Sequence, residues 1–181
     1  MARVALAAAL AALLLLLVPS ALGSHTAAPA SVGIAGNFQW ALGCPDWNPP
    51  CPATQLAHQG NGVWRGEWTV PTGTWQYKAA LNGGWDESYA GTHRADGNTS
   101  LVVPATRTVR FYYDHKTHAV MDSVMDRIPV AVGSFQDELG CGGDWAEACL
   151  RTLMTDADGD GTYEFSTASL PAGSYLSLIH I

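Results

Sequence analysis

Two tryptophans occur in turn-rich segments rather than in runs of alternating apolar and polar residues. Trp47 lies between Cys44 and Cys51, and Trp85 follows a Gly-Gly pair. A disulfide across the first of these loops would remove about 2.5 kcal/mol of conformational entropy from the unfolded chain, and three prolines restrict the loop further. We therefore expect a rigid loop that presents an indole as a flat binding platform. The simpler alternative is that Trp47 only caps the end of a sheet.

Asp86 and Glu87 are adjacent carboxylates that directly follow Trp85. Neighbouring residues of an extended segment point to opposite sides. A glycosidase instead needs two carboxyl groups that face each other across a sugar, roughly 5–9.5 Å apart. The chain also contains no Gly-x-Ser-x-Gly motif, phosphate-binding loop or plausible catalytic triad. The sequence therefore favours a binding role over catalysis.

The string Asp156-Ala-Asp158-Gly-Asp160 resembles the first half of a calcium-binding loop. The twelfth position, counted from Asp156, is Thr167 instead of the glutamate that such loops use. We predict an acidic turn and no cofactor, with calcium binding at these three aspartates as the alternative.

The segments that carry these side chains occur twice in the chain. The run Ile34-Ala-Gly-Asn-Phe-Gln-Trp-Ala-Leu-Gly-Cys44 is matched by Ala131-Val-Gly-Ser-Phe-Gln-Asp-Glu-Leu-Gly-Cys141, and the likeness continues to residue 175. The second cysteine loop ends at Cys149 and keeps a tryptophan, Trp145. A tandem module is therefore present, and residues that both copies keep are expected to be framework.

Repeat 1 shows short strand patterns separated by turn residues every eight to twelve positions. We predict strands at Val32–Gly36, Thr54–His58, Val63–Val70, Thr74–Leu81, Ser100–Val103, Arg107–Asp114 and His118–Met121. Strand alternation places Trp64, Trp68, Trp75 and Tyr77 toward the core and Lys78 on the outer side. The predicted fold is all-β, an immunoglobulin-like β-sandwich in which one complete module is followed by a truncated second copy.

The boundaries follow from the repeat and from the composition of the termini. An apolar run, Val4–Val18, ahead of small residues predicts a signal peptide at 1–23. The other expected segments are a flexible lead-in (24–30), module 1 (31–120), a linker (121–128), a partial module 2 (129–175) and a non-native tail (176–181). In module 2, Tyr163 and Phe165 are expected as core aromatics on a strand. Because half a sandwich lacks covering strands, its edges and apolar face should be open.

Charge and cysteine usage limit the partners. Nine basic against sixteen acidic residues give a net charge of −7 without a basic cluster, which disfavours nucleic acid and membrane as partners. A signal peptide with two close cysteine pairs predicts a secreted protein with disulfides among Cys44, Cys51, Cys141 and Cys149. His115 and His118 lie three apart in a predicted strand segment, so we expect surface histidines that face opposite ways rather than a metal pair.

The motifs around the loop tryptophans resemble a known group of modules. Gly36-Asn-Phe before Trp47, Val70-Pro-Thr-Gly-Thr-Trp-Gln-Tyr-Lys78 and Leu81-Asn-Gly-Gly-Trp85 are similar to the glycogen- and starch-binding sandwich modules of amylolytic enzymes. The form with Leu-Gly-Cys, Asp-Trp and Trp-Asp-Glu-Ser-Tyr resembles the tandem modules that precede the catalytic barrel of bacterial pullulanases and related secreted α-amylases.

The resemblance implies an α-glucan partner, with Trp47 and Trp85 stacking on sugar rings and Lys78 and Asn98 bonding to sugar hydroxyls. Asp86 and Tyr89 are further candidate contacts in the same segment. The resemblance also implies a downstream catalytic domain in the same polypeptide. This chain would then be an N-terminal fragment of that polypeptide. The alternative is a spacer that packs on that domain without binding sugar. Exposed loop indoles would favour binding, and buried ones would favour the spacer.

Overall fold

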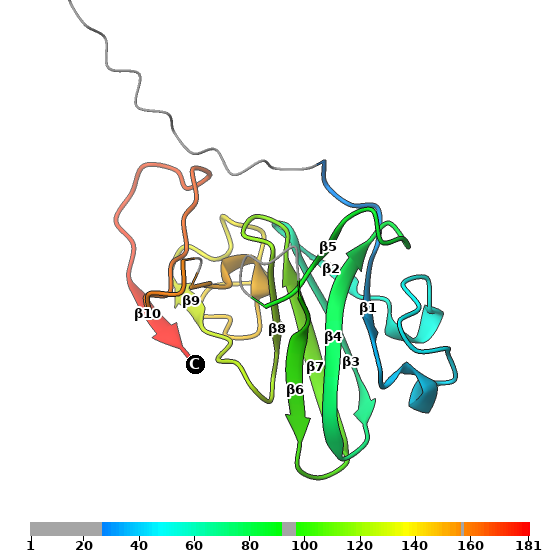
Figure 1. Ribbon diagram of the computed structural model, residues 1–181. Coiled ribbons are helices and arrows are strands. Elements are labelled where there is room, and N and C mark those ends of the chain that lie inside the picture. The colour runs from blue at the N-terminus through cyan, green and yellow to red at the C-terminus, as the bar shows by residue number, and fades with distance from the viewer. Residues whose placement is uncertain (1–26, 92–96, 157) are drawn as a thin grey trace, which may run out of the picture.

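The structure is a computed structural model and describes residues 27–91, 97–156 and 158–181 (Figure 1). The predicted signal peptide at 1–23 and residues 24–26 of the predicted lead-in lie outside these ranges. The regular elements of the described part are β-strands and short 3-10 helices. Within the same ranges, no helix has the length and apolar character that a membrane crossing would require.

Repeat 1 consists of two antiparallel sheets that lie face to face (Figure 1). In the first sheet, strand β4 is central and pairs with β1, β5 and β6. The bounds of these strands are Val32–Gly36 (β1), Gly73–Leu81 (β4), Ser88–Tyr89 (β5) and Thr99–Val103 (β6). The second sheet has the order β2-β3-β7-β8, with bounds Ala57–Gly60, Val63–Val70, Arg107–Asp114 and Ala119–Asp122.

The core of repeat 1 lies between these sheets, because alternate residues of both point inward. Its buried side chains include Val32, Ile34, Tyr77, Ala79, Leu81 and Leu101 from the first sheet, and Val70, Val109, Phe111 and Val120 from the second. Phe111 stacks on Trp68 and Phe38, with ring centroids 4.8 and 5.6 Å apart. Burying one large apolar side chain contributes about 1.5–3 kcal/mol. The predicted β-sandwich is confirmed, while the immunoglobulin-like strand order stays a prediction.

The predicted strands of repeat 1 are largely confirmed. Val32–Gly36, Val63–Val70 and Arg107–Asp114 have the predicted bounds, and three other strands shift by one residue. The first half of the strand predicted at Thr54–His58 is wrong, because a 3-10 helix, η2 (Pro52–Thr54), precedes a β2 that begins only at Ala57. A proline at the first helical position, directly after a disulfide-bonded cysteine, favours a helical turn since its ring fixes φ near −65°.

Repeat 2 has fewer regular elements: β9 (Val130–Gly133), the 3-10 helix η3 (Leu150–Thr152) and β10 (Ser177–His180). Strand β10 comes from the tail that we expected to be non-native. It pairs with β9 so that Ser177 lies opposite Gly133. In repeat 1, Tyr77 lies opposite Gly36, so β10 takes the place that β4 has in the first copy. The origin of the tail stays a prediction.

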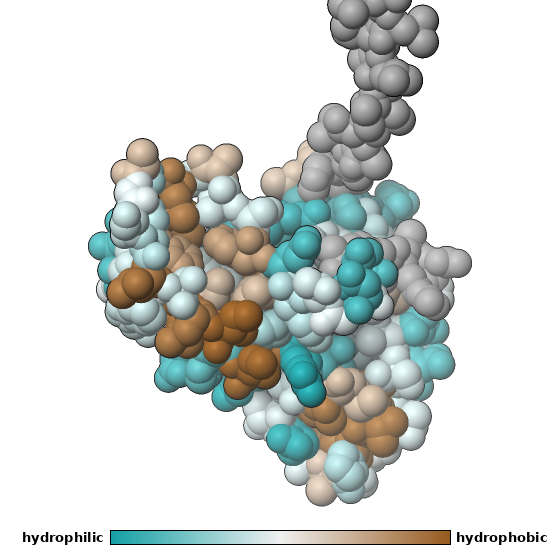
Figure 2. Space-filling view, turned by 90° about the vertical axis from the view of Figure 1, so that its left-hand side faces the viewer, coloured by the Kyte–Doolittle hydropathy of each residue, from teal (hydrophilic) through white to brown (hydrophobic). Residues whose placement is uncertain are grey.

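One face of repeat 2 is apolar and open among the described residues. A pocket of about 650 Å³ on this face is lined by Ala131, Phe135, Met154, Phe165, Ser177, Leu178 and Ile179. Figure 2 shows hydrophobic residues gathered on this side of the molecule. In repeat 1 the equivalent of Phe135 is Phe38, which is fully buried and stacks on Phe111 of β7. Strands β6 and β7 have no counterpart among the described residues of repeat 2.

The strand expected around Tyr163 and Phe165 is absent from the described part of repeat 2. That segment forms only a β-bridge, between Thr155 and Glu164, and both aromatic side chains are half-buried. In repeat 1 the equivalent strand, β3, pairs with both β2 and β7. Among the described residues of repeat 2, the segment around Tyr163 and Phe165 has only the bridge to Thr155.

Repeat 2 packs on the outer face of the second sheet of repeat 1. Val63, Tyr112 and Met121 form a buried cluster with Leu153 of repeat 2. At the edge of this contact, Asn61 Nδ2 donates a hydrogen bond of 2.6 Å to the Arg151 carbonyl. The two copies therefore share a buried contact. The first two residues of the predicted linker, 121 and 122, belong to β8.

The two histidines that we expected at the surface lie elsewhere. His115 is buried and His118 half-buried, and their Nδ1 atoms lie 3.1 and 2.9 Å from the Tyr113 hydroxyl. Strand β7 ends at Asp114, so both histidines lie in the following turn, where strand alternation does not apply. A left-handed φ of 59° at His118 brings its ring onto Tyr89.

Candidate functional site

The loop after β1 is closed by a disulfide. It begins with a 3-10 helix, η1 (Gln39–Leu42), and Gly43 is the C-cap of this helix. The φ of Gly43 is 82°, a left-handed conformation that glycine adopts without a Cβ clash. Cys44 and Cys51 are joined as predicted, with their Cα atoms 6.0 Å apart. The loop is therefore short, cross-linked and turned back on β1.

Gln39 holds this loop together from inside. Its side chain is fully buried, and Oε1 accepts hydrogen bonds from the backbone N–H groups of Gly36 (3.2 Å) and Asn48 (2.8 Å). Its Nε2 lies 3.1 Å from the Ile34 carbonyl, 3.0 Å from the Asn48 carbonyl and 2.8 Å from the Thr54 hydroxyl. Partners on both amide atoms offset the cost of burying a polar side chain. One side chain thus ties the loop to β1 and η2.

Trp47 has a backbone conformation that is rare for a bulky residue. Its φ is 55°, in the left-handed region, at a cost of roughly 1–3 kcal/mol. Its N–H donates a hydrogen bond of 3.2 Å to the Gly36 carbonyl at the end of β1. Strain of this kind persists only where surrounding contacts enforce it, and it gathers at binding sites. Here the disulfide and Gln39 supply those contacts.

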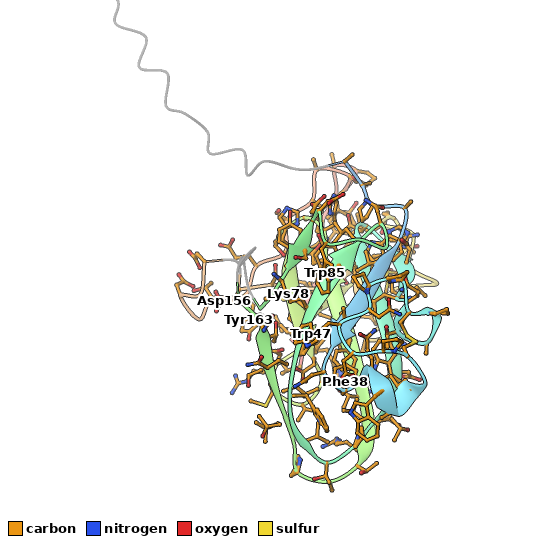
Figure 3. All side chains as sticks on the ribbon, turned by 45° about the vertical axis from the view of Figure 1, so that its right-hand side comes forward. Phe38, Trp47, Lys78, Trp85, Asp156 and Tyr163 are labelled. Atoms are coloured by element: carbon orange, nitrogen blue, oxygen red, sulfur yellow. A yellow bond between two sulfur atoms is a disulfide. The ribbon has the colours of Figure 1, made fainter. Side chains whose placement is uncertain are left out.

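Trp85 meets Trp47 from the far end of β4. The chain reverses after Leu81 through Asn82 and Gly83, whose φ angles are 54° and 72°. Trp85 is 45% exposed, and its ring centroid lies 6.4 Å from that of Trp47, with the ring planes 47° apart. Figure 3 shows the two indoles and Lys78 in one region of the sandwich. The structure therefore brings together the two loop tryptophans that the sequence singled out.

Lys78 lies on the face of the first sheet that the disulfide loop covers. It alternates with buried residues along β4 and pairs with Ala35 of β1, which shares its side of the sheet. A Cβ added at Gly33, two residues before Ala35 on that same side, would lie 2.6 Å from the Pro49 carbonyl oxygen. The loop and Lys78 are therefore on the same outer face, as strand alternation predicts.

Asn98 and Asp86 extend this surface. Asn98 is exposed and its Nδ2 donates a hydrogen bond of 3.1 Å to Gln76 Oε1. Gln76 is the outward residue before Lys78 on β4, so its amide group connects Asn98 to the same face. Asp86 is exposed next to Trp85.

Tyr89 differs from the other candidates because its ring lies inside the sandwich. It pairs with inward-facing Ala79, and its ring is parallel to that of His118 with a centroid distance of 4.0 Å. Its hydroxyl donates a hydrogen bond of 2.8 Å to Glu87. The same residue lines a shallow pocket of about 260 Å³ together with residues 85–88. Tyr89 therefore lies beside the Trp85 segment, and its role as a sugar contact stays a prediction.

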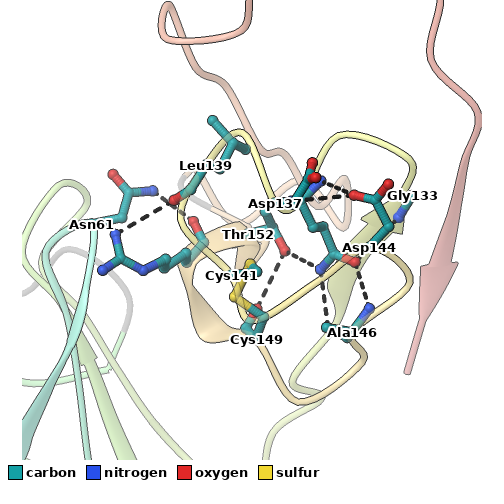
Figure 4. Close-up of a disulfide and its surroundings, with 11 residues drawn as sticks. Asn61, Gly133, Asp137, Leu139, Cys141, Asp144, Ala146, Cys149 and Thr152 are labelled. Atoms are coloured by element: carbon teal, nitrogen blue, oxygen red, sulfur yellow. Dashed lines mark hydrogen bonds between the residues drawn. A yellow bond between two sulfur atoms is a disulfide. The ribbon is translucent and has the colours of Figure 1, made fainter.

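Repeat 2 builds the same loop geometry around Trp145. The φ of Trp145 is 58°, and its N–H donates a hydrogen bond of 3.2 Å to the Gly133 carbonyl. Gln136 takes the place of Gln39, and its Oε1 accepts from the Ala146 N–H at 2.7 Å. The predicted Cys141–Cys149 disulfide is also present (Figure 4). Trp145 is 47% exposed and has no aromatic neighbour among the described residues.

The predicted acidic turn is closed by backbone groups. The Asp156 carboxylate accepts the N–H groups of Gly159 and Gly161 at 2.8 and 2.9 Å. A hydrogen bond from the Thr162 backbone N–H to the carboxylate lowers the pKa of Asp160. Carboxylate oxygens of Asp156, Asp158 and Asp160 lie within 4.8 Å of one another. Calcium binding at this turn stays an alternative.

A comparison with known families establishes what kind of module this is. The family model described as the pullulanase X25 domain matches residues 31–120 and again 128–179. The chain belongs to this family. The two matches coincide with the internal repeat, so repeat 1 and repeat 2 are successive X25 domains. The second match also includes most of β10.

Relatives of this X25 pair are pullulanase-type enzymes. It is 35% identical over 158 residues to an amylopullulanase of Thermoanaerobacter thermohydrosulfuricus, covering 82% of this chain and 10% of the relative. An amylopullulanase of Thermoanaerobacterium thermosulfurigenes is 37% identical over 163 residues, covering 83% of this chain and 8% of the relative. The chain thus spans about a tenth of the length of these relatives and corresponds to an accessory region of them.

A solved structure, the pullulanase from Bacillus acidopullulyticus, is 36% identical in sequence. The match covers 54% of this chain and 12% of that chain, with a TM-score of 0.48. The sequence relatives and the family model together confirm the resemblance to N-terminal pullulanase modules.

Two residues that organise the X25 loops were missed by the sequence prediction. Gln39 and Gln136 follow Phe38 and Phe135 at matching positions of the two copies. A glutamine is normally a surface residue, so composition alone gives no reason to expect it in the core. Its identity in both copies is the signal that marks it as framework.

Proposed function

We propose that this chain is a non-catalytic α-glucan-binding region of a secreted pullulanase- or α-amylase-type enzyme, and that repeat 1 binds starch, glycogen or pullulan. The observation that carries this proposal is the pair of indoles, Trp47 and Trp85, whose centroids are 6.4 Å apart beside a disulfide-closed loop. A glucose ring has an apolar C–H face that a flat indole covers. The two ring planes are 47° apart, so the pair offers apolar faces in two directions.

Sugar recognition also requires hydrogen bonds to the hydroxyl groups, and polar side chains lie beside the indoles. The hydroxyl rim of a glucose ring needs a few fixed donors and acceptors. Lys78 and Asn98 offer donors on the same face, and the exposed carboxylate of Asp86 offers acceptors. Because the disulfide and Gln39 already order the loop, binding requires little further ordering, which favours affinity.

The role of such a region is to hold a catalytic domain of the same polypeptide near its polysaccharide. The relatives are named amylopullulanases, and the matched region is about a tenth of their length. A weak binding module raises the overall engagement of its partner roughly 10²–10⁴-fold through effective concentration. The two disulfides suit an extracellular location.

A spacer that packs on the catalytic domain is the competing function. It requires the loop indoles to be covered by a neighbouring domain. Repeat 2 packs on the second sheet instead, and it leaves Trp85 45% exposed and Trp47 half-buried. Both roles are compatible with indoles that repeat 2 does not cover, so sugar binding itself separates them.

Affinity gel electrophoresis of the purified protein tests the proposal, with native gels run with and without glycogen or pullulan. The variants are Trp47→Ala and Trp85→Ala, with Trp145→Ala as the matched control at the same loop position of repeat 2. We expect the polysaccharide to retard the parent and Trp145→Ala, and to retard neither of the other two.

Thermal melts of each variant separate lost binding from lost folding. Equal mobility of all four proteins in every gel would overturn the proposal and leave the spacer role in its place. Release of reducing sugar from soluble starch by this chain would contradict its non-catalytic character.

A further inference from the structure

Two Asn-Gly pairs of repeat 1, Asn61-Gly62 and Asn82-Gly83, have nearly the same backbone conformation. The φ angles are 49° and 74° in the first pair, and 54° and 72° in the second. Both asparagines are exposed. An asparagine before a glycine is prone to spontaneous deamidation, because a backbone nitrogen without a neighbouring side chain can approach the asparagine amide closely. The two pairs can therefore be compared as sites of this reaction by their surroundings alone.

The hydrogen bonds of the two side-chain amides differ in direction. Asn82 Oδ1 accepts a hydrogen bond of 2.8 Å from the Ala30 backbone N–H. Asn61 instead donates from Nδ2 to the Arg151 carbonyl over 2.6 Å. Because a backbone N–H only donates and a carbonyl oxygen only accepts, these partners fix which way each amide group points. The amide oxygen is therefore bound in Asn82, and the amide nitrogen in Asn61.

The Ala30 N–H activates the Asn82 side chain for attack. Deamidation begins when the Gly83 nitrogen attacks Asn82 Cγ, and negative charge then develops on Oδ1. A donor that is already held against this oxygen stabilises the charge in the transition state. The hydrogen bond from Asn61 gives no such help, since it engages the nitrogen that has to leave. The structure thus favours reaction at Asn82 over reaction at Asn61.

The glycine that carries the attacking nitrogen also has more space in the second pair. A Cβ added at Gly83 would meet only Pro50, at 3.8 Å. A Cβ added at Gly62 would lie 3.5 Å from Lys116 and 3.6 Å from His115. Among the described residues, no backbone carbonyl accepts a hydrogen bond from the Gly83 N–H. The turn at 82–83 therefore has room for the ring that the attack forms.

We propose that Asn82 is a site of spontaneous deamidation in this protein, and that the isoaspartate formed there displaces Trp85. The Gly83 nitrogen bonds to Asn82 Cγ, the amide nitrogen leaves as ammonia, and a cyclic succinimide results. Water then opens the ring at either carbonyl, which yields aspartate or isoaspartate. Water is the only co-reactant, and no atom changes its oxidation state.

Isoaspartate changes the backbone directly ahead of Trp85. The main chain then runs through the former side-chain carbon and gains a methylene group. The turn before Trp85 is short and closed by a hydrogen bond of 3.2 Å from the Gly84 N–H to the Leu81 carbonyl. The added length moves the Trp85 ring from its place 6.4 Å from Trp47. Loss of binding by this route rests on the proposed glucan site, whereas the modification itself does not.

Peptide mapping by mass spectrometry tests the site, after the whole protein is incubated in warm, mildly alkaline buffer. Asn61 is the matched control within the same molecule. We expect Asn82 to lose its amide several-fold faster than Asn61. In Ala30→Pro, which removes the N–H donor to Oδ1, the rate at Asn82 should fall toward that of Asn61.

The comparison within the parent needs no variant, so it decides the question even where Ala30→Pro does not fold. Deamidation of Asn61 as fast as that of Asn82, or faster, would overturn the inference. An unchanged rate at Asn82 in a folded Ala30→Pro protein would do the same, because the bound oxygen would then have no effect on the reaction.

Gel retardation by glycogen tests the consequence for the site. Aged parent protein with isoaspartate at position 82 should lose its retardation. Asn82→Asp, which has the normal backbone, and aged Asn82→Gly, which has no amide to lose, should both keep it. If the fresh parent is not retarded, the proposed glucan binding fails while the deamidation site stands. If the fresh parent is retarded and the isoaspartate form is retarded equally, the displacement of Trp85 is wrong.

Discussion

Trp47 and Trp145 share one backbone conformation in the two copies. Their φ angles are 55° and 58°, and each donates its N–H over 3.2 Å to the carbonyl of the glycine that ends the preceding strand, Gly36 or Gly133. The loops differ in length by one residue. The shared conformation therefore depends on what both copies keep, namely the disulfide, the buried glutamine and the tryptophan itself.

Replacing the buried Gln39 should disorder the loop that carries Trp47. We expect Gln39→Leu to lower the free energy of unfolding by about 3 kcal/mol, because the backbone groups of Gly36 and Asn48 lose their partners inside the protein. Urea unfolding measures the loss, and glycogen affinity should fall with it. Gln136→Leu is the matched control, which should destabilise repeat 2 and leave glycogen binding intact. Retained binding in Gln39→Leu would show that the loop is ordered by other means.

The two disulfides should contribute differently to function. Removing the first with Cys44→Ala and Cys51→Ala should lower the free energy of unfolding by about 2.5 kcal/mol, because the unfolded chain regains its loop entropy. Gel retardation by glycogen should weaken as well, since the loop of Trp47 loses its cross-link. The corresponding change at Cys141 and Cys149 serves as control and should leave retardation unchanged. Equal effects of both changes on binding would contradict a site confined to repeat 1.

The protein should lose stability in alkali through its buried tyrosines. Burial raises the pKa of Tyr77 well above its ordinary value. The negative charge of the Asp122 carboxylate, which accepts a hydrogen bond of 2.9 Å from the Tyr77 hydroxyl, raises this pKa further. Burial also raises the pKa of Tyr113. In the unfolded chain these phenols ionise near pH 10, whereas in the folded protein they keep their protons. Stability is therefore complete below about pH 10 and falls as the pH rises above it.

Urea unfolding on both sides of this pH, with phenolate absorbance recorded in parallel, checks the sign. Tyr77→Phe should weaken the alkaline loss, at a cost of about 1–3 kcal/mol near neutral pH because buried Asp122 loses a donor. Tyr163→Phe, outside the core of repeat 1, should keep the alkaline loss of the parent. Unchanged stability across pH 10 in the parent would contradict the burial of these hydroxyls.

Calcium should have little effect on this protein. Backbone N–H groups of Gly159 and Gly161 already occupy the Asp156 carboxylate, so the turn closes without an ion. We expect the melting temperature to be the same in a chelator and in excess calcium. A clear rise in the melting temperature with calcium, abolished by Asp158→Asn, would instead establish a site at the three aspartates.

Strand periodicity predicted the sandwich well where the local pattern and the tertiary contacts agree. Along β3 and β4, alternation assigned Tyr77 to the core and Lys78 to the outer face, and both assignments are confirmed. It failed at Thr54–His58 and at His115 and His118, where a proline and a turn interrupt the extended chain. Alternation holds only while backbone dihedrals stay extended, so a single turn removes its predictive value.

The sequence by itself determined the tandem repeat, the β-sandwich, the cysteine pairing within each copy and the two tryptophans that no strand period explains. Each of these follows from the order of residues within short segments, or from comparing such segments between the two copies. Only the tertiary structure decided that Trp47 and Trp85 meet at 6.4 Å, that Tyr89 turns inward, and that Gln39 is the buried centre of the loop. The tryptophan contact joins residues far apart in the chain, and the burial of Gln39 and Tyr89 depends on which side chains the fold removes from water. All of these follow from how the sheets and loops pack.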